Sequence, residues 1–539
     1  MFFNRTFHPD EANQAFTTGS LLETGVYVYK PTDHHGPTLY YAAAPLQKAF
    51  GHNDTVSLDG TLLRCTPLVF AVLAVLFAFF AIRKATGRIL PALFSSVLLA
   101  AAPIFLFYST DFIQEMLLAC FSTMMLWSAI HYLSQSHNLP IPQSPNPPIS
   151  QSHNPTISQS STPRLKPGTW ALFFGIAAGL AFATKETSVL TFATAFSAAL
   201  AVRFISPPSA SGQRPATNHL VLAILAFILT SVIFFSVFCA DWRGVYNAFV
   251  AAPLSYFHRA AGEAAGGADW HVHPWWWYAK TLFAPNKICY SLAFLPLIVY
   301  PLFIHFRRSR LFAFLALHSL ILFTLYSIIP YKTPWCMLQV ALPLLLAYGV
   351  LLGDIAATLR GGRAVAAVAF ILPFAMFIWG DASIYRDPDS RDIPYNYAHA
   401  SPKVKDLAAC VADAINNASR NQKSAADNAT TAKPEAAPQK PETRNEKPET
   451  QPMPFIAVAL PACDTWPFPW YNRSLAHITG YWNDFSSLES LARDGIKPSV
   501  VVCPAEEGHK VMPLFPHLNR TRRFEMRPRV RVRAFWSEP

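Results

Sequence analysis

The sequence is poor in charged residues. Asp, Glu, Lys and Arg make up 14% of its 539 residues, whereas a soluble chain usually carries about 25%. The chain is also 52% hydrophobic, with a mean hydropathy of +0.24. A water-facing surface over most of the chain is therefore excluded, and the deficit of charge indicates a membrane protein.

Other familiar signals are also missing. The eight cysteines include no Cys-x-x-Cys pair, so neither a zinc site nor a disulfide framework is indicated. No basic segment with a hydrophobic core precedes Thr6, so we expect no cleavable signal peptide. The net charge is +11, but the positive residues lie in short loops between apolar runs. This pattern is typical of membrane topology, and we predict the lipid bilayer, and no nucleic acid, as a partner.

What the sequence has in abundance is long apolar runs, several of which reach the ~20 residues that span a bilayer. We predict about ten transmembrane helices, at residues 67–82, 89–109, 113–133, 170–184, 187–204, 219–239, 288–306, 311–330, 336–356 and 364–381.

The loops between these runs alternate in charge. Every second loop is basic, and the basic residues are Arg83, Lys84, Arg88, Arg164, Lys166, Arg203, Arg214, Arg307, Arg308, Arg310, Arg360 and Arg363. Positive loops stay in the cytoplasm. We therefore predict a multi-pass protein of the plasma (inner) membrane whose N-terminal loop and C-terminal region are extracytoplasmic.

We predict three parts along the chain. Residues 1–66 form a first extracytoplasmic loop, and residues 67–381 form a transmembrane domain with a disordered Ser/Pro-rich cytoplasmic linker at 134–169. Residues 382–539 form a small extracytoplasmic α/β domain with a disordered insertion at 418–454. A helical pattern over Pro402–Ile415 and strand-like runs at Phe455–Leu460 and Ser499–Cys503 support that last domain.

Polar residues gather in the loops predicted to be extracytoplasmic. The opening stretch Thr6-Phe-His-Pro-Asp-Glu-Ala12 holds an acid pair, and His35 follows in a second polar stretch. Ionisable groups at the mouth of a membrane bundle are costly and by default mark a function. An ordinary polar loop is the alternative for any one of them.

Three short loops on the same side carry further charge. Asp111 is followed by Glu115 one turn later, Lys185-Glu186 separates two apolar runs, and the third loop reads Tyr331-Lys-Thr-Pro-Trp335. Carboxylates suit a general base, and lysines suit a phosphate. Together they favour transfer from a phosphate-linked lipid.

Several of these motifs resemble one family in order and type. The opening His-Pro-Asp-Glu-Ala, the His35-Gly-Pro-x-Leu-Tyr-Tyr41 that follows, Tyr331–Trp335, Ser401-Pro402 and Trp466-Pro-Phe-Pro-Trp-Tyr471 resemble polytopic GT-C glycosyltransferases. These are the relatives of protein O-mannosyltransferases and lipid A aminoarabinose transferases (glycosyltransferase family 39). The resemblance is closest to a bacterial and archaeal branch described as flippase-activity-associated membrane proteins.

The resemblance implies a GT-C-like fold and an inverting transfer of sugar from a polyprenyl-phosphate carrier to an acceptor hydroxyl of a glycan, lipid or protein. It implies that Asp10 deprotonates the acceptor. The predicted catalytic residues are Asp10, Glu11 and Asp111, and the predicted donor- and phosphate-binding residues are Lys185, Lys332, His35, Glu186 and Trp335. No cofactor and no metal site are predicted, although a divalent metal is left open because metal use varies among GT-C enzymes.

The family pattern places a membrane helix before the Asp-Glu loop, so we expect either a late gene start or a truncated chain. The alternatives are a transport or flippase-associated component that handles lipid-linked glycans, and an inactive relative. A transporter is expected to carry mid-helix charges and an internal repeat, and neither is evident. Trp466, Trp470 and Tyr471 are either sugar-stacking rings or residues that form the core of the C-terminal domain or dock it on the bilayer.

Overall fold

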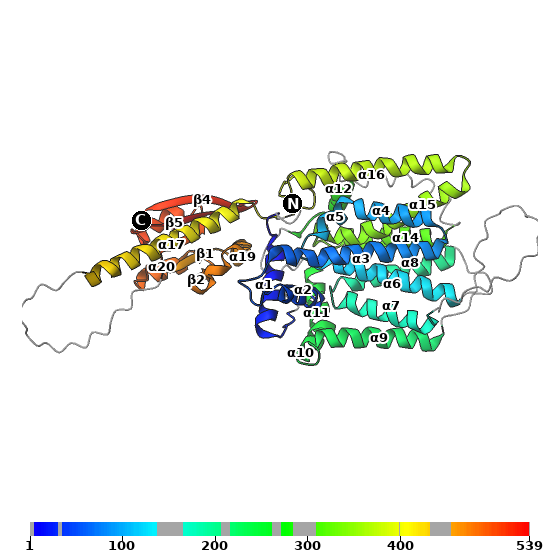
Figure 1. Ribbon diagram of the computed structural model, residues 1–539, viewed down its shortest axis with the longest axis horizontal. Coiled ribbons are helices and arrows are strands. Elements are labelled where there is room, and N and C mark those ends of the chain that lie inside the picture. Colours follow the sequence, from blue (N-terminus) through cyan, green and yellow to red (C-terminus); the bar gives the residue numbers. More distant parts are fainter. Residues whose placement is uncertain are drawn as a thin grey trace, which may run out of the picture. The chain divides into compact units, whose positions relative to one another are not determined.

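The computed structural model describes residues 5–30, 35–136, 165–205, 216–260, 271–283, 309–397, 399–431 and 454–537. By its internal contacts the chain divides into two units (Figure 1). We call Thr17–Tyr397 the membrane unit, and Asn4–Phe16 with Ala398–Pro539 the C-terminal unit. The predicted linker 134–169 lies mostly outside the described residues, and the predicted helix 288–306 lies wholly outside them.

The membrane unit is helical. Its helices are the last part of α1 (Pro9–Thr24), α2 (Thr38–Ala49), α3 (Gly60–Thr86), α4 (Ile89–Ala101), α5 (Pro103–Ser109), α6 (Glu115–Ser136), α7 (Pro167–Phe182), α8 (Ser188–Ile205), α9 (Thr217–Phe235), α10 (Arg243–Tyr246), α11 (Ala252–Ala260), α12 (Trp277–Phe283), α14 (Arg310–Ile328), α15 (Met337–Thr358) and α16 (Gly362–Arg386).

Within the described residues, seven helices are long and apolar enough to cross a membrane, or eight if the bent pair α4–α5 is one span. The apolar helix α7 is shorter. The prediction of an α-helical polytopic membrane protein is therefore confirmed. The predicted span 89–109 consists of two helices, α4 and α5, which meet at an angle of 61°. Pro103 causes this break, since a proline lacks the N–H donor and pushes the preceding residue into an extended conformation.

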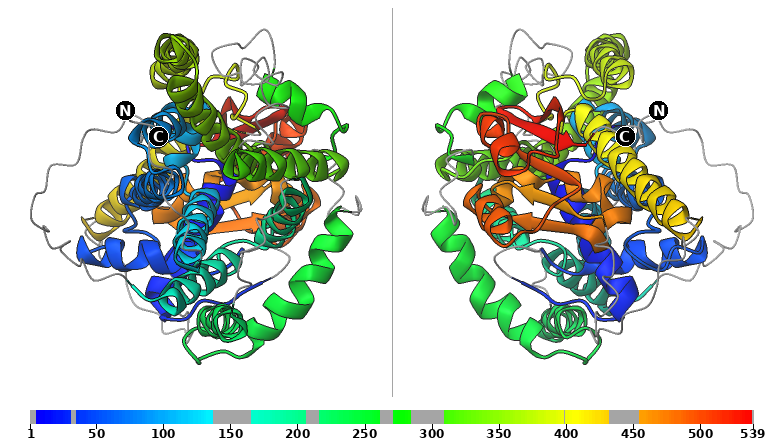
Figure 2. Two further views of the ribbon diagram at one scale, coloured as in Figure 1. Left: turned by 90° about the vertical axis from the view of Figure 1, so that its right-hand side faces the viewer. Right: turned by 90° about the vertical axis from the view of Figure 1, so that its left-hand side faces the viewer.

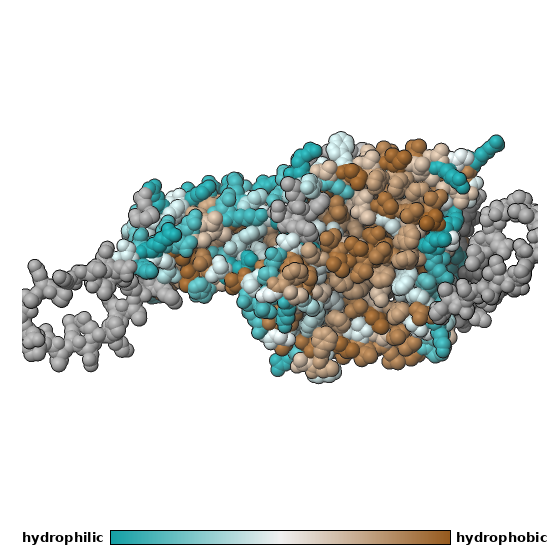
Figure 3. Space-filling model, viewed as in Figure 1, coloured by the Kyte–Doolittle hydropathy of each residue, from teal (hydrophilic) through white to brown (hydrophobic). Residues whose placement is uncertain are grey.

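The helix α15 is the centre of the membrane unit. In its most apolar window 89% of the residues are buried, against 17% for α9, which presents its apolar side chains outward as a lipid-facing helix does. Gly349 and Gly353 let α15 approach the backbone of α4 at Ser95 and Pro91, which is how small residues pack helices in membranes. Figure 3 shows the resulting apolar surface over the helices of this unit.

The C-terminal unit contains a five-stranded mixed sheet in the order β2-β1-β3-β5-β4. The strands are β1 (Ile456–Ala459), β2 (Thr479–Trp482), β3 (Val500–Pro504), β4 (Arg520–Arg527) and β5 (Val530–Trp536). β1 pairs in parallel with β2 and β3, whereas β5 pairs antiparallel with β3 and β4. The helices of this unit are α17 (Lys403–Thr431), α18 (Ala462–Thr465), α19 (Phe468–Tyr471), α20 (Ser486–Arg493) and α21 (Val511–Leu514).

Both faces of this sheet are covered. Ile456 and Val458 point toward a core shared with Val404 and Leu407 of α17, which runs along the sheet in Figure 2 (yellow). The alternate residue Ala457 faces a second core that contains residues of α20 and α21. This alternation is why a short apolar strand can serve two layers. The predicted small α/β domain is confirmed, and α17 extends to Thr431, into the range 418–454 expected to be disordered.

Candidate active site

The first predicted site motif is the start of helix α1. The Asp10 N–H donates to Nδ1 of His8 at 3.1 Å, and the His8 N–H donates to Oε2 of Glu11 at 3.0 Å. With Pro9 at the first helical position, this is a reciprocal cap of the capping-box type, in which a histidine takes the usual place of Ser or Thr. The sequence His-Pro-Asp-Glu therefore builds a defined helix start.

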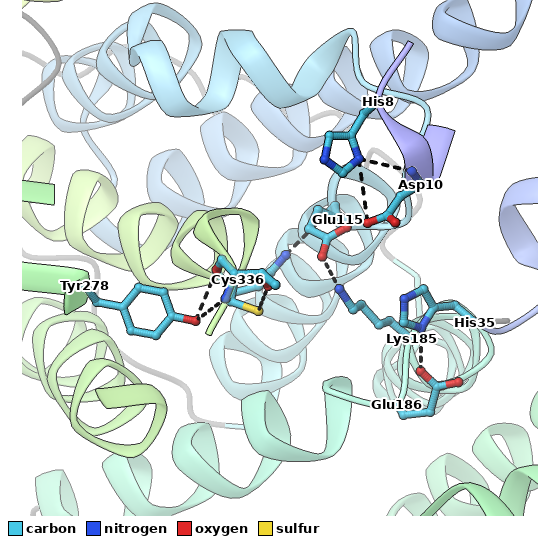
Figure 4. Close-up of polar contacts among 10 residues, drawn as sticks. His8, Asp10, His35, Glu115, Lys185, Glu186, Tyr278 and Cys336 are labelled. Carbon is cyan, nitrogen blue, oxygen red and sulfur yellow. Dashed lines mark hydrogen bonds and ion pairs between the residues drawn. The ribbon is translucent and has the colours of Figure 1, made fainter. Parts of the chain in front are cut away.

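The two acids of this motif have different surroundings. Glu11 is fully buried, and its carboxylate accepts the capping hydrogen bond. The Asp10 side chain is 49% exposed and lies 3.8 Å from Nδ1 of His8 (Figure 4). Of the pair, Asp10 is the one whose carboxylate is open to a substrate.

Asp111 lies in the connection between α5 and α6. Its side chain is buried at 5% exposure, and its backbone carbonyl accepts from the N–H of Ile113 at 2.7 Å. Glu115 opens α6 directly afterwards and is also buried. Two acids thus lie close together in the chain at this end of the membrane unit.

Lys185 forms a buried ion pair with Glu115. Its Nζ donates to Oε1 of Glu115, and both side chains are buried (Figure 4). Burial alone would lower the pKa of Lys185, but the Glu115 carboxylate outweighs it and raises that pKa. The pair links the α7–α8 connection to the start of α6, and the charge of Lys185 is matched within the protein. Phosphate binding by Lys185 stays a prediction.

Glu186, the next residue, holds the predicted site residue His35. Its carboxylate lies 2.9 Å from Nδ1 of His35 and accepts from the Tyr29 hydroxyl at 2.6 Å. Burial alone would raise the pKa of Glu186, but His35 and Tyr29 outweigh it and lower that pKa. The hydroxyls of Thr38 and Thr184, 2.7 Å apart, complete the attachment of this stretch to the α7–α8 connection.

Lys332 lies in the connection between α14 and α15, where the residue as a whole is 1% exposed. Its Nζ donates to the backbone carbonyl of Ile329 and lies 5.9 Å from the ring centre of Tyr278. Among the described residues no carboxylate lies within ion-pair distance of it. Burial therefore lowers the pKa of Lys332 below its ordinary value.

The backbone around Lys332 is held by the segment 271–278. The Lys332 N–H donates to the carbonyl of His271 at 2.7 Å, and Val272 pairs with Tyr331 in a β-bridge. The Tyr278 hydroxyl both donates to the Thr333 carbonyl and accepts from the Thr333 N–H, at 3.1 and 3.0 Å. The position of Lys332 is thus set by backbone contacts.

Aromatic rings surround this turn. Tyr397 meets Trp335, the last predicted site residue, edge-on at 6.4 Å, and Trp335 is half-buried. His273 stacks on Trp277 at 4.3 Å and lies 3.2 Å from the Tyr397 hydroxyl. The aromatic run of this segment therefore packs around the Lys332 turn.

These connections lie at one end of the membrane unit. The Glu115–Lys185 pair joins α6 to the α7–α8 connection, and Nε2 of Gln339, in the first part of α15, donates to the backbone carbonyl of Glu115 at 3.1 Å. Asp10 and Glu11 belong by their contacts to the C-terminal unit. No three His, Cys, Asp or Glu side chains are grouped to hold a metal ion in the part of the chain that the structure describes.

Sequence reasoning did not assign the partners of the predicted residues. The sequence shows Glu115 only through its spacing from Asp111, and it does not pair Tyr29 with Glu186. Glu186 and Tyr29 are 157 positions apart in the chain, so no local pattern reports their contact. The one usable signal was a charged residue in a tight loop between apolar helices, since such a group needs a partner.

Comparisons with known proteins identify the fold. No family profile and no curated protein sequence match the chain. Among solved structures, it is similar to ArnT from Cupriavidus metallidurans bound to undecaprenyl phosphate, with 14% identity, a TM-score of 0.60, and coverage of 99% of this chain and 96% of ArnT. The apo state of the same ArnT gives a TM-score of 0.58 at 15% identity, over 99% of this chain and 95% of that one.

A second neighbour is the archaeal oligosaccharyltransferase AglB from Archaeoglobus fulgidus in complex with an inhibitory peptide and a dolichol-phosphate. Its identity to this chain is 14% and its TM-score 0.50, with coverage of 94% of this chain and 66% of AglB. The chain therefore has the GT-C fold, as the resemblance implied. These similarities do not test the resemblance to the branch of flippase-activity-associated membrane proteins.

Proposed function

We propose that this GT-C protein is a membrane glycosyltransferase. It moves a sugar from a polyprenyl-phosphate-linked donor to an acceptor hydroxyl of a glycan, lipid or protein on the extracytoplasmic face. In support, the solved neighbours with this fold are an ArnT bound to undecaprenyl phosphate and an oligosaccharyltransferase bound to dolichol-phosphate.

The observation that carries the proposal is the charge of Lys332, a buried residue that has no carboxylate within ion-pair distance among the described residues. The residue is 1% exposed, and its ammonium has a backbone carbonyl as its hydrogen-bond acceptor. Burying an ion without a counterion costs several kcal/mol, so the site suits an anion that arrives from outside. A lipid-linked phosphate at the polar end of a membrane bundle is such an anion. Lys185 differs, because Glu115 already matches its charge.

Asp10 is the proposed general base. A base must be reachable by the acceptor and fixed in orientation, and Asp10 is half-exposed at a capped helix start. Its carboxylate takes the proton of the acceptor hydroxyl while that oxygen bonds to the anomeric carbon. The bond from that carbon to the phosphate oxygen breaks, and the polyprenyl phosphate leaves with the electron pair. The chemistry is an inverting displacement in which Lys332 stabilises the charge that develops on the phosphate.

The remaining predicted residues take supporting roles in this proposal. Glu11 caps the helix that carries Asp10, and the Lys185–Glu115 and Glu186–His35 pairs hold the donor end of the membrane unit. Asp111 and Trp335 line the same set of connections. We propose that residues 67–381 span the plasma membrane and that residues 1–66 and 382–539 are extracytoplasmic.

The test is transfer of labelled sugar from polyprenyl-phosphate donors in membranes that contain this chain. Asp10→Asn removes the base and is expected to lower turnover roughly 100- to 10,000-fold, the range of general base catalysis. Glu23→Gln is the matched control, because it removes an exposed carboxylate from the same helix. Each reaction is run with EDTA and with added divalent metal, which decides whether a metal is needed.

Unchanged transfer by Asp10→Asn would remove Asp10 as the base. If no sample transfers sugar but a lipid-linked glycan still binds, the enzyme reading fails, and the non-catalytic component that handles lipid-linked glycans takes its place.

A further inference from the structure

The arm formed by residues 5–16, which carries Asp10, is attached to the aromatic segment Trp466–Tyr471 of the C-terminal unit. The Phe7 ring stacks on Trp470 with 4.6 Å between centroids and 16° between planes. The Phe7 N–H donates to the Tyr471 hydroxyl at 2.9 Å, and Phe16 meets Trp466 edge-on at 5.4 Å. These contacts hold the arm on both sides of Asp10 in the sequence.

The Trp470 ring is committed to this attachment. Its side chain is 3% exposed, and the guanidinium of Arg473 lies 4.1 Å from its centre. A ring covered by Phe7 and by a guanidinium has no open face for a sugar. Of the two readings of Trp470 from the sequence, the packing role fits this geometry.

The path from Phe7 to Asp10 is short and rigid. Phe7 directly precedes His8, whose ring accepts from the Asp10 N–H at 3.1 Å, and Glu11 accepts from the His8 N–H at 3.0 Å. The cap thus fixes the conformation of every residue between the stacked ring and the carboxylate. A displacement of Phe7 is transmitted to Asp10, and a misplacement of about 1 Å is enough to cost a reaction roughly 100-fold.

The location of the attachment has a parallel in other folds. Trp466–Tyr471 follows β1, the middle strand of the parallel part of the sheet, where the chain leaves for β2 on one side and returns to β3 on the other. Open α/β sheets bind their ligands beyond the carboxyl ends of their strands at such a reversal of strand order. In this chain the segment after β1 receives the chain's own N-terminal arm.

We propose that Phe7, Trp470 and Tyr471 are positioning residues for the general base. The C-terminal domain then acts as the support that orients Asp10. The inference rests on the proposed function, in which Asp10 is the base, and it adds a role for the C-terminal domain in turnover.

Steady-state kinetics on the full chain in nanodiscs test this role. Phe7→Ala is expected to lower kcat roughly 10- to 100-fold and to leave the KM for the donor unchanged, since a residue that positions the base acts on the chemical step. Phe7→Tyr keeps the stacked ring and is expected to restore kcat. Tyr471→Phe removes one hydrogen-bond acceptor and is expected to lower kcat about two- to tenfold. Tyr246→Phe, the same change at an exposed tyrosine of α10, is the matched control and leaves kcat unchanged.

Hydrogen exchange of the backbone amides of Phe7, His8 and residues 10–12 gives a readout that does not need activity. Trp470→Ala is expected to speed their exchange, while the amides of β1 and β3 keep their protection and so report a folded domain. Unchanged exchange in the arm would overturn the inference.

The two proposals fail in distinguishable ways. Turnover that is insensitive to Asp10→Asn removes Asp10 as the base, and the absence of transfer in every sample contradicts the proposed function. Turnover that requires Asp10 but is unaffected by Phe7→Ala and Tyr471→Phe contradicts only the positioning role. A rise in donor KM equal to the fall in kcat/KM would also contradict it, because that pattern reports lost donor binding.

Discussion

Lys332 and Lys185 are both buried lysines of the membrane unit, and replacing each by methionine is expected to change stability in opposite directions. Lys185→Met leaves the Glu115 carboxylate buried at 2% exposure without its partner. Breaking a buried pair in this way costs about 3–5 kcal/mol. Lys332→Met leaves no carboxylate behind among the described residues, and methionine has a similar length and suits an apolar site.

The size of the Lys332 effect follows from its contacts. Removing an ammonium from water costs several kcal/mol even after the protein relaxes. The hydrogen bond to the Ile329 carbonyl returns about 1.5–3 kcal/mol, and the contact with the Tyr278 ring returns about 0.5–2 kcal/mol. We therefore expect Lys332→Met to stabilise the protein without donor by about 1–2 kcal/mol.

Thermal unfolding in nanodiscs measures both effects, with Lys280→Met as the control for an exposed lysine of α12. A polyprenyl phosphate at 100 times its Kd is expected to stabilise the wild type by about 2.7 kcal/mol and to leave Lys332→Met unchanged. If Lys332→Met destabilises as much as Lys185→Met, then Lys332 has a structural partner and the argument for a phosphate is refuted. Equal stabilisation of both proteins by the lipid would refute it as well.

Three further outcomes follow from particular contacts. Because burial lowers the pKa of Lys332, its side chain loses the proton at a lower pH than an exposed lysine does. The donor KM is therefore expected to rise at alkaline pH. Lys332→Arg keeps the positive charge, so the same rise of KM in this variant would contradict deprotonation of Lys332 as the cause. Because the pKa of Glu186 is lowered in the folded protein, the stability that its carboxylate contributes is present at neutral pH and is lost as the pH falls through that pKa. Glu186→Gln should therefore unfold at a lower temperature than the wild type at pH 7, and the gap between the two unfolding temperatures should shrink in acid. An equal gap at both pH values would exclude the ion pair with His35 as the source of the stability. Gly349→Leu places a side chain against Ser95 of α4 and is expected to destabilise by about 1–3 kcal/mol. Gly168→Ala on α7, where an added Cβ lies 3.5 Å from its nearest neighbour, serves as a comparison in the same unfolding assay.

The sequence by itself determined the class of the protein. Long apolar runs with few charges can satisfy their backbone groups in a bilayer only as helices, so the polytopic helical fold could be predicted from composition and length alone. The small α/β domain was also predictable, because its strands are short apolar runs between helical patterns. The order of short motifs, from His-Pro-Asp-Glu to Tyr331–Trp335, was enough to indicate the GT-C fold that the solved neighbours support.

Only the tertiary structure decided what each charged residue contacts. Lys185 and Lys332 look alike in the sequence, since both lie in tight loops between apolar helices, yet one is matched by Glu115 and the other has a backbone carbonyl. The attachment of Phe7 to Trp470 joins the two ends of the chain and could not be read from either. The physical reason is the same in each case: hydropathy and helix caps are local properties, whereas the partner of a buried charge or ring is set by how distant segments pack.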